Sequence, residues 1–175
     1  AEMLKEDPEI THVGIIHSET TSGILNDIAA VGKAVKAAGK TFIVDAMSSF
    51  AGVDIDVPGI GIDFLVSSAN KCVQGVPGFS YIICRRTALA ACEGKSRSLS
   101  LDLYAQWVTM EKDGKWRFTS PTHTVLAFAK ALEELQEEGG IQARAKRYLE
   151  NNRELIRRME AMGIRPYIDA EHQGP

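Results

Sequence analysis

Lys71 is the residue of this sequence best placed to do covalent chemistry. It follows the apolar run 64–66 and a short stretch of small polar residues, and Gly75 and Gly78 come soon after it. A charged lysine buried at the end of a strand is costly unless it is paired or neutralised. A lysine amine in such a place can form a Schiff base with an aldehyde. The position therefore predicts a lysine that holds an aldehyde cofactor.

Asp45 supplies the acid that this chemistry needs. It ends a second apolar run, 42–44. If Asp45 and Lys71 each end a strand of one parallel sheet, both lie at its carboxyl edge, where open α/β sheets bind ligands. In pyridoxal phosphate enzymes an acid keeps the pyridine nitrogen protonated. Taken singly, Asp45 could begin a turn and Lys71 could be solvated; taken together, they favour pyridoxal 5′-phosphate as the cofactor.

The elements around these two residues predict an α/β fold with a mostly parallel sheet flanked by helices. Four short apolar runs bounded by turn residues are predicted strands, at residues 11–16, 41–44, 63–67 and 78–84. A helix over 27–38, ending at Gly39, joins the first two and implies parallel pairing. The fourth strand should be antiparallel, because the link from Lys71 is too short for a crossover helix.

The second half of the sequence is less regular. Residues 95–119 lack clear periodicity, and their aromatic side chains could form core or pack on a partner subunit. Ser120 is predicted to cap a helix that ends at Gly139 and Gly140. A long charged helix over 141–162 follows, and we interpret its arginines and glutamates as a solvated face. Residues 164–168 are strand-like.

The composition excludes several classes of function. Hydrophobic residues make up 45% of the 175-residue chain, as in soluble globular domains. A net charge of −3 argues against nucleic acid as a partner. No apolar stretch approaches the roughly 20 residues of a membrane span. Three cysteines without CxxC spacing suggest neither a disulfide framework nor a zinc site, and a reducing, cytoplasmic location is expected.

Four segments together resemble the class V, fold-type-I aminotransferases. The resemblance covers nearly the whole chain and is strongest around Lys71. The segments that carry it are residues 17–23 (HSETTSG), 45–49 (DAMSS), 67–79 (SSANKCVQGVPGF) and 116–123 (WRFTSPTH). The chain would then form part of the large domain of a pyridoxal phosphate-dependent transferase.

The resemblance implies a role for each matching residue. Lys71 would hold the cofactor through a Schiff base and then carry the proton between substrate and cofactor. Asp45 would pair with the pyridine nitrogen, and Thr21 would lie near the phenolic oxygen. Met47 would pack against the ring, and Asn70 would lie close to the cofactor phosphate.

The resemblance also implies partners and an organisation. Either Thr119 or Thr122 would donate to the cofactor phosphate of a neighbouring subunit, so a homodimer is expected. The lysine segment is most similar to enzymes of phosphonate catabolism. They move the amino group of 2-aminoethylphosphonate to pyruvate and yield phosphonoacetaldehyde and L-alanine. Residues 1–140 would belong to the cofactor-binding large domain. Residues 141–175 would be a linking helix and the start of an incomplete C-terminal domain.

Departures from the family pattern are informative. Asn70 stands where the cysteine desulfurase branch usually has histidine, which counts against sulfur chemistry. The chain starts without methionine, and we interpret it as an internal piece of a longer protein. The family's phosphate-binding loop and carboxylate-binding arginine would then lie outside it, so the piece should bind cofactor weakly and be inactive alone. Two alternatives stay open, an alanine– or serine–glyoxylate aminotransferase and a non-catalytic α/β fragment. A GxGxxG nucleotide fingerprint is not found in the sequence.

Overall fold

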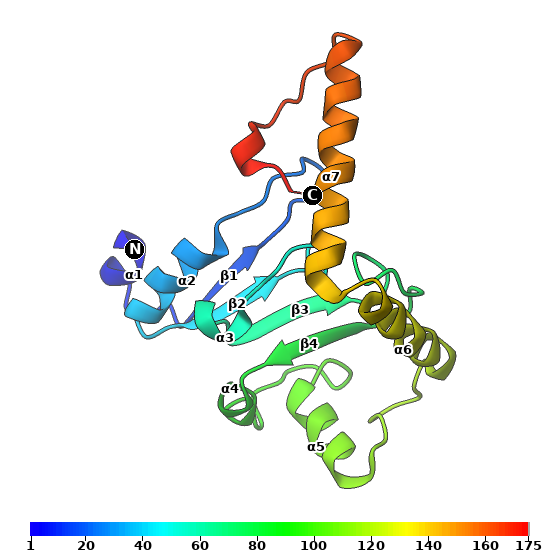
Figure 1. Ribbon diagram of the computed structural model, residues 1–175. Coiled ribbons are helices and arrows are strands. Elements are labelled where there is room, and N and C mark those ends of the chain that lie inside the picture. Colours follow the sequence, from blue (N-terminus) through cyan, green and yellow to red (C-terminus); the bar gives the residue numbers. More distant parts are fainter. Residues whose placement is uncertain (175) are drawn as a thin grey trace.

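A four-stranded sheet lies at the centre of the computed structural model, which describes residues 1–174 (Figure 1). Its strands lie in the order β1-β2-β3-β4. Their bounds are β1 (His12–Ile16), β2 (Thr41–Asp45), β3 (Phe64–Ser68) and β4 (Ser80–Cys84). The first three strands are parallel, and β4 is antiparallel to β3. The predicted α/β fold with a mostly parallel sheet is confirmed, as is the antiparallel fourth strand.

One face of the sheet carries the main core, under α2 (Ile28–Ala37) and α3 (Val57–Ile60). Alternate strand residues point to this face, so the buried positions recur every second residue. The fully buried apolar side chains of the strands are Phe42, Val44 and Leu65, and they pack with Ile28 and Val35 of α2. Asp27 caps α2 by accepting from the Ala30 amide, which confirms the predicted start of this helix.

Asp63 fixes the amino end of β3. It is 4% exposed and pairs with Lys36 of α2 at 3.2 Å and with Arg85 after β4 at 3.1 Å. Its Oδ2 also accepts the Phe42 amide at 2.8 Å. Because a buried carboxylate must be paired and hydrogen-bonded, these contacts join α2, β2 and β4 at one end of the sheet.

A second, smaller core lies beneath α6 (Thr122–Glu137) and α7 (Gly140–Ala161). Ala131 and Leu135 of α6 pack there with Ala51 and Val73, which come from the loops after β2 and β3. The predicted glycine pair lies where α7 begins, and both glycines have a positive φ, 110° and 79°. Only glycine adopts such backbone angles readily, so the pair turns the chain sharply between the helices.

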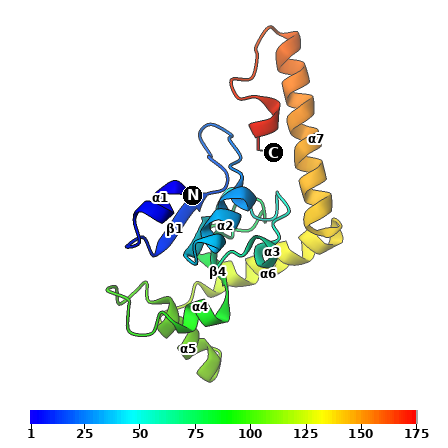
Figure 2. The same cartoon turned by 90° about the vertical axis from the view of Figure 1, so that its left-hand side faces the viewer.

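The 22-residue helix α7 extends away from the sheet, and the end of the chain returns alongside it (Figures 1 and 2). A short 3-10 helix, η1 (Ala170–His172), lies on this return path. The Gly174 amide then donates to the Gly23 carbonyl at 2.7 Å, and the Leu25 amide donates to the His172 carbonyl at 2.8 Å. The loop after β1 is thereby held by residues far away in the sequence.

Three expectations about secondary structure are wrong. Residues 95–119 are not irregular throughout, because α5 (Leu103–Asp113) forms between an Asp102 cap and the left-handed Gly114. Residues 164–168 form no strand in the described structure. The Ser120 hydroxyl bonds the Thr122 hydroxyl instead of capping α6, and Pro121 occupies the cap position.

The remaining helices are short and lie at the ends of the sheet. They are α1 (Glu2–Glu6) and α4 (Arg86–Ala90). None of the helices in residues 1–174 combines the length and the apolar character needed to cross a membrane.

Candidate active site

The loops that follow β1, β2 and β3 meet at the carboxyl edge of the sheet. Side-chain hydrogen bonds join them: His17 Nδ1 lies 2.9 Å from Ser49 Oγ, and Thr20 and Ser48 share a hydroxyl–hydroxyl bond. The Cys72 thiol donates to the Ser48 carbonyl at 3.3 Å. Three polar segments that are distant in sequence therefore form one surface, where parallel sheets bind ligands.

A hollow of about 200 Å³ lies between the first two of these loops. Three of the residues predicted for the site, Thr21, Asp45 and Met47, line it together. The Asp45 carboxylate accepts the Met47 amide through Oδ1 at 2.9 Å. Its second oxygen makes no hydrogen bond to any other residue in 1–174. Asp45 thus begins a turn and still presents one carboxylate oxygen for a ligand.

Lys71 lies three residues beyond the end of β3 and is exposed, so the expectation of a buried ammonium is wrong. Its amine makes no hydrogen bond or ion pair within the described chain, and the neighbouring Asn70 is exposed as well. The turn is held by its backbone instead. The Gln74 amide donates to the Lys71 carbonyl, and the Gly75 amide donates to the Ala69 carbonyl, both at 2.8 Å.

Two glycines let this turn close against its surroundings. A Cβ on Gly75 would lie 2.7 Å from the Ala69 carbonyl oxygen, so any larger residue would open the turn. A Cβ on Gly52 would lie 2.6 Å from the Cys72 sulfur. Gly75 is therefore required for steric reasons, because only a residue without a Cβ allows the backbone of the lysine turn to approach this closely.

Ser68 is a candidate site residue that the sequence reasoning missed. Its hydroxyl is buried and has no hydrogen-bond partner in the described chain. Asp45 pairs in register with Val66, two residues before Ser68, so Asp45 and Ser68 point to the same face of the sheet. A buried hydroxyl without a partner calls for an explanation such as a ligand or an unseen water.

The donor set at this edge suits pyridoxal phosphate. An aldehyde requires an amine, which Lys71 provides, and a pyridine nitrogen requires a carboxylate, which Asp45 provides. A phosphate requires hydrogen-bond donors, and the unpartnered Ser68 hydroxyl is available for this role.

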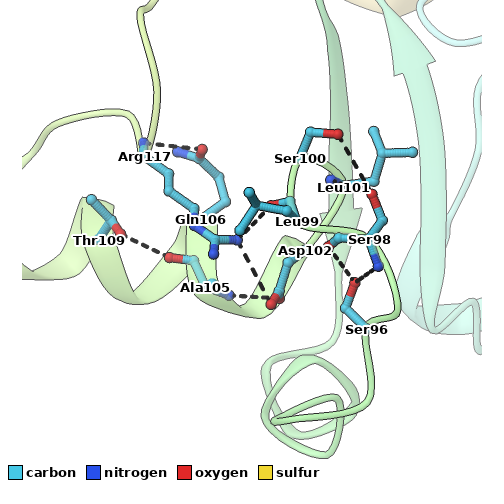
Figure 3. Close-up of polar contacts among 10 residues, drawn as sticks. All are labelled: Ser96, Ser98, Leu99, Ser100, Leu101, Asp102, Ala105, Gln106, Thr109 and Arg117. Carbon is cyan, nitrogen blue, oxygen red and sulfur yellow. Dashed lines mark hydrogen bonds and ion pairs between the residues drawn. The ribbon is translucent and has the colours of Figure 1, made fainter.

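Thr119 and Thr122 do not join this group. Both are exposed and lie beside the start of α6, outside the hollow that Asp45 lines. The segment before them is anchored by Arg117 (Figure 3). Its side chain donates to the Leu99 carbonyl at 2.8 Å and lies 3.7 Å from Asp102, which caps α5. The Arg117 side chain thus ties residues 114–121 to the loop before α5.

His17 is the buried titratable group of the site. It is 4% exposed and directly follows β1, where its amide donates to the Asp45 carbonyl at 2.8 Å. Burial lowers the pKa of His17 below its usual value, because the charged imidazolium would lose its hydration there. Burial thus favours the neutral ring beside Ser49, while the backbone amide of His17 bonds the Asp45 carbonyl.

The fold and this edge define a class of protein. Residues 2–173 match the family model described as Aminotransferase class-V, and the chain belongs to this family. The solved structure of pyridoxamine-pyruvate aminotransferase from Mesorhizobium loti superposes with a TM-score of 0.89 at 29% identity. The match covers 99% of this chain and 45% of that one.

Curated relatives agree on a more specific name. A 2-aminoethylphosphonate–pyruvate transaminase from Klebsiella pneumoniae subsp. pneumoniae is 58% identical over 175 residues, covering 99% of this chain and 48% of the relative. A protein of the same name from Bacillus cereus is 58% identical over 174 residues, covering 99% of this chain and 51% of the relative. The chain spans about half the length of these relatives.

The lowered pKa of His17 gives stability a defined pH dependence. The unfolded chain takes up the proton first, at a pKa of about 6.5. This contribution is complete above that pKa and declines as the pH falls below it. The free energy of unfolding should fall when the pH is lowered from about 7.5 to about 5.5. We expect it to fall less in His17→Gln than in the unaltered chain, as measured by urea titrations.

The exposed His123 supplies the control for this experiment. His123→Gln should keep the full pH dependence. An unchanged pH dependence in His17→Gln would show that the buried imidazole is not its source.

Proposed function

We propose that the full-length protein is a pyridoxal phosphate-dependent aminotransferase. It transfers the amino group of 2-aminoethylphosphonate to pyruvate, giving phosphonoacetaldehyde and L-alanine in phosphonate catabolism. One observation supports pyridoxal phosphate as the cofactor. The Asp45 carboxylate lines a hollow at the carboxyl edge of the sheet, and the Lys71 turn follows β3 at the same edge. The substrates rest on the shared name of relatives that are 58% identical.

When bound, the cofactor supplies an aldehyde carbon and a ring that draws electrons from the reacting carbon. Lys71 Nζ holds the cofactor before the substrate arrives, then moves a proton to and from the substrate carbon. Asp45 keeps a proton on the pyridine nitrogen through the carboxylate oxygen that its own turn leaves free. The amino group of the first substrate would stay on the bound cofactor until the second substrate takes it, so we expect ping-pong kinetics.

The other site residues bind and orient. Thr21 lies on the wall of the hollow shared with Asp45 and would donate to the phenolic oxygen. Met47 would pack against the ring. Asn70 and the unpartnered Ser68 hydroxyl would donate to the phosphate.

A homodimer would complete the site. We propose that Thr119 or Thr122 donates to the phosphate of the partner's cofactor. Arg117 supports this role because it holds the preceding segment in place. Apolar side chains beside that segment are exposed, with Leu99 at 73%, Leu101 at 82% and Phe118 at 51%. Burial of such side chains is what an obligate interface provides.

The same proposal assigns two parts to the chain. Residues 1–140 form part of the cofactor-binding large domain, and 141–175 form the linking helix and the start of a second domain. The cytoplasmic location expected from the sequence stays a prediction.

Loss of the Lys71 amine should abolish the bond to the cofactor. We expect the full-length protein with pyridoxal phosphate to absorb in the visible, and Lys71→Ala to lose this band after removal of free cofactor. Lys95→Ala, on an exposed residue of a surface loop, is the control and should keep the band. Identical spectra for all three proteins would favour the non-catalytic alternative.

Asp45→Asn should retain more cofactor binding than catalysis. The amide fills the same space but cannot stabilise a protonated pyridine nitrogen. We expect kcat to fall by at least about 100-fold, which corresponds to ~2.7 kcal/mol, with a much smaller change in cofactor Kd. Near-normal turnover in the full-length variant would remove Asp45 from this role.

The substrate assignment is tested by comparing amino donors. We expect 2-aminoethylphosphonate with pyruvate to give a kcat/KM at least about 100-fold above alanine or serine with glyoxylate, since a site that pairs with a phosphonate discriminates against donors that lack it. Phosphonoacetaldehyde and alanine are measured together. Preference for a glyoxylate pair would replace the substrate claim and leave the aminotransferase class standing.

A further inference from the structure

Helix α7 makes direct contact with the turn that carries Lys71. The side chain of Arg144 is buried, with the residue 2% exposed, although its helix was predicted to have only a solvated charged face. Its Nη1 donates to the carbonyl oxygens of Cys72 and Val73, both at 3.0 Å. These are the two residues that directly follow the lysine.

Glu138 makes the burial of this guanidinium possible. Its Oε2 accepts from Arg144 Nε at 2.9 Å and from Nη2 at 2.7 Å. The carboxylate is shared with Arg147, whose Nε donates to Oε1 at 2.7 Å. The bonds from Arg147 and Arg144 lower the pKa of Glu138 to about 2, so the pair stays charged at neutral pH. Arg147 bonds Glu138 and stacks on the Tyr148 ring, whereas Arg144 bonds both Glu138 and the backbone of the lysine turn.

Other contacts from the same side of α7 reach the same turn. The Gln74 side-chain amide donates to Tyr148 Oη at 2.7 Å. Ile141 packs on the small core that contains Val73. Residues 141, 144 and 148 recur at helical spacing and so share one face. Gln74 has a φ of 64°, a conformation that residues other than glycine rarely keep without support.

We propose that Arg144 is a positioning residue for Lys71. The inference rests on the role proposed above for Lys71. The lysine amine has no partner within residues 1–174, so its location is set by the backbone that follows it. Arg144 binds two consecutive carbonyls of this backbone and fixes them to α7. Loss of these bonds should allow the turn to fluctuate and the amine to leave the place where cofactor and substrate meet.

The first test needs no cofactor. Hydrogen–deuterium exchange of residues 69–76 is measured in the cofactor-free, full-length protein. Arg144→Lys keeps the charge for Glu138 but cannot reach the carboxylate and two carbonyls at once. We expect exchange in this segment to be about tenfold faster, since the lost bonds involve a charged donor. Arg153→Lys is the matched control: it makes the same exchange at an exposed position of the same helix and should leave the segment unchanged.

The second test uses the loaded protein. At a temperature where both variants are folded by circular dichroism, we expect Arg144→Lys to lower kcat about tenfold while KM changes less than twofold. Its visible absorbance per bound cofactor should also fall. If Arg144 had only a structural role, the variant would have a lower Tm, but kcat, KM and the absorbance per bound cofactor of the folded protein would stay unchanged.

The outcomes separate this inference from the proposed function. Unchanged exchange in Arg144→Lys at unchanged Tm would overturn the positioning role, even if Lys71→Ala loses the visible band. Faster exchange supports the anchoring of the turn, even if Lys71→Ala keeps the band and the proposed function fails. If Arg144→Lys does not fold, Arg144→Met decides. This variant keeps a long side chain but removes both donors to the turn, while Glu138 stays paired with Arg147, so faster exchange in residues 69–76 supports the proposal and unchanged exchange overturns it.

Discussion

The parallel pairing of β1, β2 and β3 is the constraint on which the rest of the structure depends. Parallel strands end at the same edge, so the three loops that follow them must meet. The pairing of Ile16 with Asp45 and of Asp45 with Val66 then sets which side chains share a face. A slip of one residue would turn Asp45 toward the core and Phe42 toward solvent. The buried Asp63, bonded to the Phe42 amide at the other end, holds this register.

The carboxyl edge combines a rigid support with an exposed reactive group. Asp45 lies on a strand and is held by the backbone of its own turn, whereas Lys71 lies on a loop beyond a strand end. The role proposed for Lys71, bonding to a cofactor and moving a proton, would require a free side chain on a fixed backbone. Two features fix this backbone. Gly75 allows the turn to close tightly, and side chains of α7 bond to the residues that follow Lys71.

Local signals in the sequence were sufficient for the sheet, and they placed Asp45 at its carboxyl edge. Apolar runs, a crossover helix and a short link determine strand number and direction, because each depends on neighbours in the chain. Asp45 and Lys71 stand out because charged residues are unusual at or close to the end of a buried strand. Helix α5 was missed even though its Asp102 cap and Gly114 stop are present, because its apolar positions do not form a clear helical stripe.

Contacts between distant segments were not predictable in this way. The Arg144 bond to Val73 spans 71 residues, and in the sequence Arg144 looks like every other arginine of α7. The Ser68 hydroxyl likewise looks like an ordinary serine, and only its lack of a partner in the described structure marks it. Burial is decided by which helix face meets which loop. The sequence of α7 is highly charged and has few apolar residues, so it does not reveal which face of this helix is buried.

Arg144 supplies hydrogen-bond donors to carbonyl groups of the lysine turn that would otherwise have none in the described chain. A turn that leaves a sheet buries carbonyl groups that neither a strand nor a helix satisfies, and such groups must find donors. A hydrophobic residue at position 144 would fill the space, but it would leave the Cys72 and Val73 carbonyls unpaired. Burying a guanidinium costs several kcal/mol unless it is paired. Glu138 offsets this cost, and the planar fork of arginine lets one side chain reach the carboxylate and both carbonyls. Lysine carries its three donors on one nitrogen and cannot span acceptors that lie on different sides of a planar fork, so this geometry favours arginine at position 144.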